Sequence, residues 1–222
     1  MGTSPTVVLQ CSRIAMDLFW LVREFTTKES AVMKVAPGEL IFASWLLFGG
    51  YWFFAALGAK KAAKKENLPE RFLHVLIMAI GFFLLYANDA RFGLLNRRFT
   101  PDEMWIDWMG AMATLAGVLF ALWARYTIGK EWSGEVQIKQ DHQLIRTGPY
   151  AHIRHPIYTG MLLALTGTAI TVGEYRAILG VALFLIGFVR KAKKEESFLA
   201  REFGPAFDEH RRHTGFFLPR FT

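Results

Sequence analysis

Five stretches of the chain contain no lysine, arginine, aspartate or glutamate, and polar segments separate them. They are residues 40–59, 72–88, 108–124, 157–173 and 177–189. About 20 apolar residues span a bilayer as a helix, with roughly 17 at the short end. The first four stretches therefore predict transmembrane helices. The fifth has the length of a short core helix, but only a few residues separate it from the fourth, so we interpret these two as a transmembrane helical hairpin.

Small residues recur in the two helices of this predicted hairpin. The fourth stretch contains Gly160, Ala164 and Gly167, and the fifth contains Gly180 and Gly187. Small side chains allow membrane helices to approach closely. We therefore expect the two helices to pack against each other through these positions.

Two polar segments leave the same end of the hairpin. Residues 126–156 form a connection whose length is typical of functional or disordered segments, and their aromatic and aliphatic residues speak against disorder. Pro156 suits the first turn of the helix that follows. The C-terminal segment continues the fifth stretch as an amphipathic helix until Gly204 and Pro205 interrupt it. Both segments must lie side by side, so the mouth of the hairpin is the candidate site.

Charge and composition indicate a membrane partner. The chain is 53% hydrophobic and carries a net charge of +7, with its basic residues at the ends of apolar stretches. This placement favours anionic lipid headgroups over nucleic acid. If residues 60–71, 125–154 and 190–220 are cytoplasmic, 18 of the 26 lysines and arginines lie inside, as the positive-inside rule requires. The sequence therefore predicts a multi-pass, all-α integral membrane protein with about five transmembrane helices.

Four motifs occur in order around the hairpin mouth: His142, GPY at 148–150, RHPIYTG at 154–160 and KKEE at 193–196. Together they resemble the isoprenylcysteine carboxyl methyltransferase family, within a wider group that includes phospholipid methyltransferases. The resemblance runs from about residue 132 to the C-terminus. It implies an S-adenosylmethionine-dependent methyltransferase with a cytoplasmic cofactor-binding segment.

The resemblance also implies the residues of the site. Those implied to bind the cofactor are Gln137, His142, Leu144, Ile145, Tyr150, Arg154, His155, Pro156, Ile157, Tyr158 and Glu195. Arg190 or Lys191 falls where the family places a basic residue that meets the acidic end of the substrate. The chain departs from the family at Phe207 and His210, where tyrosines are common.

The chemistry of these side chains agrees with such a ligand. A guanidinium at Arg154 can clamp a carboxylate with two parallel hydrogen bonds, and the rings of Tyr150 and Tyr158 can attract a sulfonium. Adjacent helical residues point about 100° apart. We therefore expect Glu195 to face the site and Glu196 to face outward.

The chain divides into three predicted parts. They are an N-terminal segment (1–37), transmembrane helices one to three (38–125) and a methyltransferase core (126–222). Arg13 and Asp17 interrupt the apolar stretch 6–22, which favours an interfacial helix over a further span.

Other polar residues receive plainer interpretations. His152 and His155 have a spacing that metal ligands also use, but no third ligand stands near them, so we expect no metal. His74 and Asp107 lie in or near predicted spans and are interpreted as packing or interface residues.

The expected partners are membrane lipids and a lipophilic, prenylated or lipid substrate, and no nucleic acid. Two alternatives are an NADPH-dependent membrane reductase, similar to sterol reductases, and a non-catalytic membrane protein. The sequence leaves the methyl acceptor and the oligomeric state open.

Overall fold

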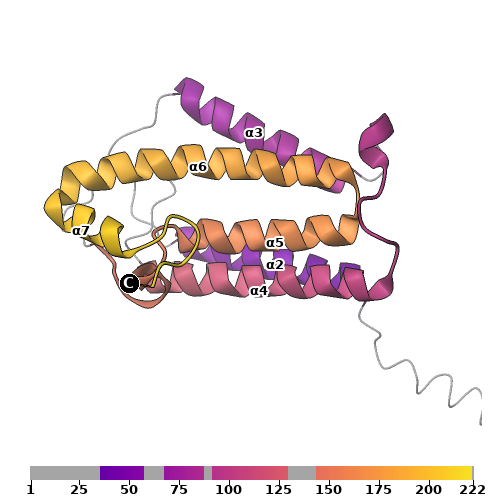
Figure 1. The fold of residues 1–222 in the computed structure, drawn as a ribbon, viewed down its shortest axis with the longest axis horizontal. Coiled ribbons are helices and arrows are strands. Elements are labelled where there is room, and N and C mark those ends of the chain that lie inside the picture. The colour runs from indigo at the N-terminus through magenta and orange to yellow at the C-terminus, as the bar shows by residue number, and fades with distance from the viewer. Residues whose placement is uncertain (1–35, 58–67, 88–91, 130–143, 222) are drawn as a thin grey trace, which may run out of the picture. The chain divides into compact units, whose positions relative to one another are not determined.

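The computed structural model describes residues 36–57, 68–87, 92–129 and 144–221, and residues 37–222 form one compact unit. The described residues are helical, as expected (Figure 1). The α-helices are α2 (Pro37–Leu57), α3 (Leu68–Tyr86), α4 (Met104–Ile128), α5 (Pro156–Val172), α6 (Tyr175–Phe203) and α7 (Pro205–His213). Two 3-10 turns, η1 (Gly93–Asn96) and η3 (Gly148–Ala151), lie in the connections. The expected N-terminal interfacial helix lies outside the described residues.

Three of the described helices, α2, α3 and α4, are long and apolar enough to cross a membrane. Helix α5 has 17 residues, which at about 1.5 Å per residue is slightly shorter than a hydrocarbon core of about 30 Å. Helix α6 has 29 residues, but its apolar part lies between Arg176 and Arg190. Three of the five expected spans are thus confirmed by length and composition, and the crossing of α5 and α6 stays a prediction.

The small residues of α5 face α4, and not α6 as we expected. A Cβ atom added to Gly160 would lie 2.6 Å from the backbone nitrogen of Ala121, and one added to Gly117 would lie 2.5 Å from the carbonyl oxygen of Gly160. Gly167 approaches α4 in the same way. The expectation was wrong because α4 carries a second row of small residues, and two such rows bring the backbones closest.

The small residues of α6 face α3. A Cβ atom on Gly180 would lie 2.8 Å from the carbonyl oxygen of Gly81, and one on Gly187 would meet the Met78 side chain. Arg176, only 1% exposed, joins the same two helices, because its guanidinium donates to the Leu84 carbonyl oxygen at 2.7 Å. Helix α5 therefore lies between α4 and α6, with α2 packed on α4 and α3 packed on α6.

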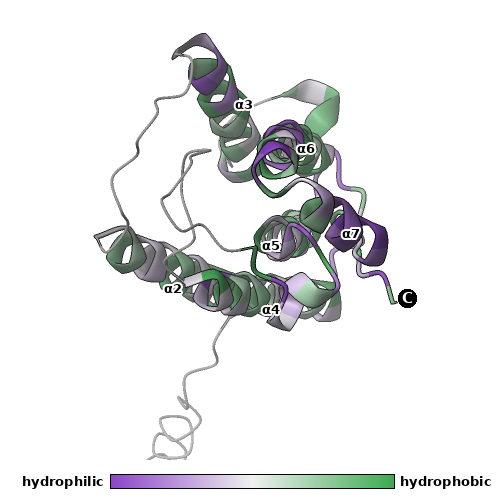
Figure 2. Cartoon of the chain, turned by 90° about the vertical axis from the view of Figure 1, so that its left-hand side faces the viewer, coloured by the Kyte–Doolittle hydropathy of each residue, from purple (hydrophilic) through white to green (hydrophobic). Residues whose placement is uncertain are grey.

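The polar end of α6 forms as the sequence predicts. The helix continues past Val189 to Phe203, and Gly204 then adopts a positive φ of 49°. Pro205 begins α7. Figure 2, which looks onto this end of the unit, shows hydrophilic residues gathered on α7 and on the near part of α6. Helix α4 packs on α5, and the predicted division of the chain into three parts stays a prediction.

Candidate functional site

A short turn places polar side chains at the start of α5. Gly148, the first residue of the turn η3, has a φ of 57°, a conformation that favours glycine, and Pro149 follows it. Pro156 is the first residue of α5, where its fixed φ fits and its missing N–H costs nothing. Arg154 and His155 therefore stand at the entrance to α5, with Tyr158 one turn further along the helix.

These three side chains meet two glutamates of α6. His155 lies between them, with Nε2 3.2 Å from Glu196 Oε1 and Nδ1 3.6 Å from Glu195 Oε2. The Tyr158 hydroxyl donates a hydrogen bond of 2.7 Å to Glu195 Oε1. We call Arg154, His155, Tyr158, Glu195 and Glu196 the mouth cluster. The structure therefore brings Arg154 and Glu195 to the same site, as the sequence predicts.

Glu196 also belongs to the site, contrary to our expectation. Its carboxylate accepts a hydrogen bond of 2.5 Å from Arg154 Nε, and the two side chains are only 16% and 12% exposed. The two glutamates do point in different directions, but the site surrounds this part of α6 on two sides. Glu195 faces α5 at Tyr158, whereas Glu196 faces the turn before α5 at Arg154.

Arg154 also holds the C-terminal segment. Its Nη1 donates to the carbonyl oxygen of Arg211 at 3.3 Å and to that of Thr214. In this structure its guanidinium thus joins α6, the turn before α5 and the end of α7. The predicted contact of Arg154 with a cofactor carboxylate stays a prediction.

The carboxylates determine the charge at His155. Burial alone lowers the pKa of this imidazole, but hydrogen bonds and the negative charges of Glu195 and Glu196 outweigh burial and raise the pKa above its usual 6.5. For Glu196, burial raises the pKa, whereas hydrogen bonds from His155 and Arg154 outweigh burial and lower it below 4.5. The mouth cluster therefore favours an imidazolium paired with carboxylates.

Tyr158 joins the mouth cluster to the apolar interior. Its ring stacks on Phe188 of α6 with a centroid distance of 5.0 Å and an interplanar angle of 13°. It also lies nearly parallel to the His155 ring, at 5.8 Å and 19°. Phe188 belongs to a buried core cluster that includes Leu85, Leu165 and Phe184. Tyr158 thus contacts both the polar mouth cluster and the apolar core cluster.

The C-terminal segment after α7 completes the site, and sequence reasoning missed it. We call residues 214–217 the tail segment. Its backbone runs beside the turn before α5: Arg154 N–H donates to Gly215 O at 2.9 Å and His155 N–H to Phe216 O at 3.3 Å. Phe216 lies edge-on to the His155 ring at 4.9 Å, with the Arg154 guanidinium 5.7 Å from its centroid. The available signal was the aromatic pair Phe216 and Phe217 directly after Gly215, behind the charged residues of α7.

Other predicted cofactor residues pack together behind the mouth cluster. Ile145, Tyr150 and Ile157 form an apolar cluster with Ala124 of α4. Burial, followed by the charge of Glu195, raises the pKa of the Tyr150 hydroxyl. Leu144 is half-buried and Pro156 is fully buried. Gln137 and His142 lie outside the described residues.

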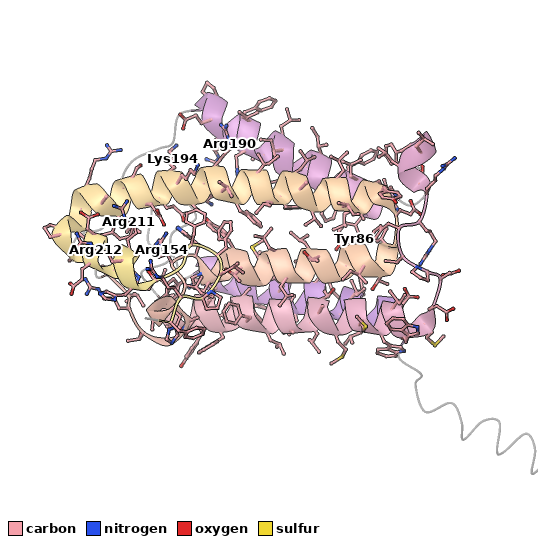
Figure 3. The ribbon with its side chains drawn as sticks, in the orientation of Figure 1. Tyr86, Arg154, Arg190, Lys194, Arg211 and Arg212 are labelled. Atoms are coloured by element: carbon pink, nitrogen blue, oxygen red, sulfur yellow. The ribbon has the colours of Figure 1, made fainter. Side chains whose placement is uncertain are left out.

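The two basic candidates on α6 lie on different faces. At about 100° per residue, Lys191 is about 40° from Glu195 around the helix, whereas Arg190 is about 140° away. Arg190 is exposed, and its charge acts on Glu70 of α3. Figure 3 shows Arg190 and Lys194 on the side of α6 turned toward α3, and Arg154 on the opposite side. The geometry therefore favours Lys191 over Arg190 for the predicted substrate contact.

The remaining polar candidates lie apart from the mouth cluster. His152 is exposed and its ring is tilted against that of Phe221, with the ring centroids 5.0 Å apart; its carbonyl oxygen accepts a hydrogen bond from Gly215 N–H. Asp107 lies in the first turn of α4, where its carbonyl oxygen accepts a hydrogen bond from Thr171. His74 lies within α3. Within the described residues, no group of three histidine, cysteine, aspartate or glutamate side chains is arranged to hold a metal.

Fold and site together define an all-helical integral membrane protein whose polar mouth cluster meets an apolar core at Tyr158. Residues 109–201 match the model of the Isoprenylcysteine carboxyl methyltransferase (ICMT) family. This match confirms the resemblance that the motifs predicted. The match begins within α4, earlier than the motifs suggested.

Two of the relatives carry names of different kinds. A nickel-cobalt-cadmium resistance protein, NccN, of Alcaligenes xylosoxydans xylosoxydans is 29% identical over 64% of this chain and 65% of its own length. A probable protein-S-isoprenylcysteine O-methyltransferase of Oryza sativa subsp. indica is 28% identical over 81% of this chain and 95% of its own. The chain thus covers slightly less than two thirds of the resistance protein.

A solved structure shares the fold. The eukaryotic intramembrane Ras methyltransferase ICMT superposes with a TM-score of 0.57 at 21% identity, covering 86% of this chain and 71% of the other. At this identity the similarity shows the fold alone.

Proposed function

We propose that this chain is an S-adenosylmethionine-dependent methyltransferase of the membrane, with its site on the cytoplasmic side, that methylates a lipophilic acceptor. The observation that carries the proposal is the position of Tyr158. Its hydroxyl is bonded to Glu195, and its ring is stacked on Phe188 of the apolar core. A polar ligand from water and an apolar ligand from the bilayer can therefore meet at one residue.

The donors and acceptors of the mouth cluster fit a sulfonium cofactor. The mouth cluster contains two carboxylates, one permanent cation, Arg154, and one imidazole, His155. Carboxylates accept hydrogen bonds from hydroxyl and ammonium groups, and an aromatic face attracts a sulfonium through the cation–π effect. S-adenosylmethionine carries all three groups, and when bound it supplies an electrophilic methyl group.

Each member of the cluster has a separate task in this proposal. Glu195 accepts hydrogen bonds from the cofactor and is held in place by the Tyr158 hydroxyl. Glu196 and Arg154 fix the turn before α5 to α6, so the position of His155 does not depend on the ligand. Such preorganisation lowers the entropic cost of aligning two reactants, which is worth roughly 7–11 kcal/mol in well-oriented reactions.

The acceptor needs alignment more than activation. A carboxylate is already ionised at neutral pH, so its methylation requires no general base from the protein. Lys191 lies on the same face of α6 as Glu195 and Phe188, and we assign to it the contact with an acidic acceptor group. The metal-resistance relatives carry names that describe a physiological context and not a reaction, so they add no second chemistry.

The test is methyl transfer by the purified protein in lipid nanodiscs. Isotope-labelled S-adenosylmethionine is incubated with the protein and a lipid extract, and lipid-soluble products are separated by mass spectrometry. We expect a labelled product that Glu195→Gln abolishes. Glu209→Gln is the matched control, because this glutamate of α7 has a 66% exposed side chain. Equal labelling in both variants, or NADPH oxidation in place of labelling, would refute the proposal.

A further inference from the structure

We infer that Phe217 of the tail segment is a specificity-determining residue that contacts the hydrocarbon part of the lipophilic acceptor. The inference rests on the proposed function and adds to it the residue that selects the acceptor by chain length. Its basis is the position of the Phe217 ring, where the mouth cluster meets the core cluster.

The backbone around Phe217 is held in place by α5 and by the turn before it. The Thr159 hydroxyl donates a hydrogen bond of 2.7 Å to the carbonyl oxygen of Phe217. One residue earlier, His155 N–H donates to Phe216 O, and Gly215 N–H donates to His152 O at 2.9 Å. Three successive residues of the tail segment are therefore fixed, and this leaves the Phe217 ring little freedom of position.

The Phe217 ring points to the apolar side of the site. It lies edge-on to Tyr158 at 6.4 Å and 86°, and edge-on to His155 at 6.1 Å and 78°. It also packs against the core cluster that contains Phe184 and Phe188. The neighbouring Phe216 ring instead contacts His155 and the Arg154 guanidinium. Phe217 therefore borders the apolar core cluster, and Phe216 borders the charged groups of the mouth cluster.

An acceptor whose reactive group reaches Tyr158 and Glu195 must place its apolar part beside the rings that border them. These are Phe188 on α6 and Phe217 on the tail segment. Phe188 is buried, whereas Phe217 is half-buried and comes from a segment that follows the last helix. A change at Phe217 therefore alters the apolar border of the site without removing a residue from a core helix.

The experiment measures how affinity depends on the length of the acceptor chain. S-alkyl cysteines with decyl, pentadecyl and eicosyl chains are titrated against the protein in nanodiscs, and binding is followed by thermal stabilisation. In Phe217→Ala the affinity for the longest chain, divided by the affinity for the shortest chain, should fall about tenfold, because the ring that contacts the chain is lost. A change of this size lies within the range by which apolar pockets distinguish chain lengths. Phe217→Leu keeps an apolar anchor and should give a smaller change in the same direction.

Two variants of neighbouring residues provide controls. Leu218→Ala alters an adjacent tail residue that is 77% exposed, and it should leave the ratio unchanged. Phe216→Ala should weaken S-adenosylhomocysteine binding and leave the chain-length ratio as in the wild type. A ratio that stays within twofold of the wild type in both Phe217 variants would overturn the inference, as would failure of the whole series to bind.

These titrations measure binding and require no methyl transfer. Failure of the Phe217 inference can therefore be distinguished from failure of the proposed function. If the series binds in a Phe217-dependent way but S-adenosylhomocysteine does not bind, the methyltransferase proposal fails and the acceptor contact stands. If methyl transfer occurs and the ratio is insensitive to Phe217, the inference fails and the methyltransferase proposal stands.

Discussion

Tyr158 donates a hydrogen bond of 2.7 Å to Glu195 across the α5–α6 interface. The two residues come from separate helices, 37 positions apart in the sequence, and the hydrogen bond sets the direction in which the carboxylate points. Because the same tyrosine ring stacks on Phe188, packing of the apolar core is coupled to the position of a charged group at the mouth cluster.

Removing only the Tyr158 hydroxyl should therefore weaken cofactor binding and leave the fold intact. In Tyr158→Phe the ring still stacks, but Glu195 loses the donor that orients it, so we expect about a tenfold weaker S-adenosylhomocysteine affinity, equivalent to about 1.4 kcal/mol. Calorimetric titration in nanodiscs measures the change. Tyr175→Phe, at the opposite end of α6, is the control and should bind as the wild type does. Equal affinity in the two variants would contradict the assigned role of Tyr158.

The stability contributed by His155 should depend on pH. The folded-state pKa of this imidazole is raised, so its stabilisation is fully present below the usual value of 6.5 and is lost as the pH rises through the folded pKa. The groups that face it are Glu195, Glu196 and Tyr158, with Arg154 beside Glu196. The difference in melting temperature between wild type and His155→Gln, followed by tryptophan fluorescence, should be largest below pH 6.5 and should shrink above it. A difference that grows with rising pH would show that the imidazole is bound in its neutral form.

Arg154 should hold the tail segment as well as Glu196. In Arg154→Met the half-buried Glu196 loses its ion pair with Arg154 but keeps His155, so the cost should lie below the roughly 3–5 kcal/mol typical of breaking a fully buried pair. The carbonyl oxygens of Arg211 and Thr214 also lose a donor. We expect lower thermal stability and faster amide hydrogen exchange at Gly215. Arg211→Ala is the control, because that side chain is 54% exposed and pairs with Asp208 on its own helix. Unchanged exchange at Gly215 in Arg154→Met would show that the tail segment docks without this contact.

The contact between α4 and α5 should tolerate no additional methyl group. A Cβ atom on Gly117 would lie 2.5 Å from the carbonyl oxygen of Gly160, so Gly117→Ala must push two backbones apart. Overpacking of this kind costs about 1–3 kcal/mol. Gly49→Ala on α2 meets no atom within 4 Å, and we expect it to be neutral or slightly stabilising. Thermal unfolding of the two variants side by side measures the difference, and equal melting temperatures would argue against the close approach.

The elements of the site were predictable because local signals mark them. The uncharged stretch from residue 157 and the proline before it predicted α5, and Gly204 with Pro205 predicted the end of α6. The meeting of Arg154, His155, Tyr158 and Glu195 was implied by the resemblance that the motifs carry. These features depend on chain composition and on residues close in sequence.

The features that the sequence analysis predicted wrongly or missed depend on which helix surfaces and segments pack against each other. The glycines of α5 are equally suited to pack against either neighbouring helix, and only the complementary row on α4 decides between them. Glu196 was assigned to the outside on the assumption that the site lies on one side of α6. The position of Phe217 depends on hydrogen bonds between residues more than 55 positions apart, and no local pattern in the tail encodes that pairing.

Calorimetric titration of the purified protein with S-adenosylhomocysteine measures directly whether the mouth cluster binds the cofactor. The wild-type protein should bind one molecule per chain, Glu195→Gln should bind at least tenfold more weakly, and NADPH should produce no heat of binding. Saturable binding of NADPH, or an affinity for S-adenosylhomocysteine that Glu195→Gln leaves unchanged, would contradict the account.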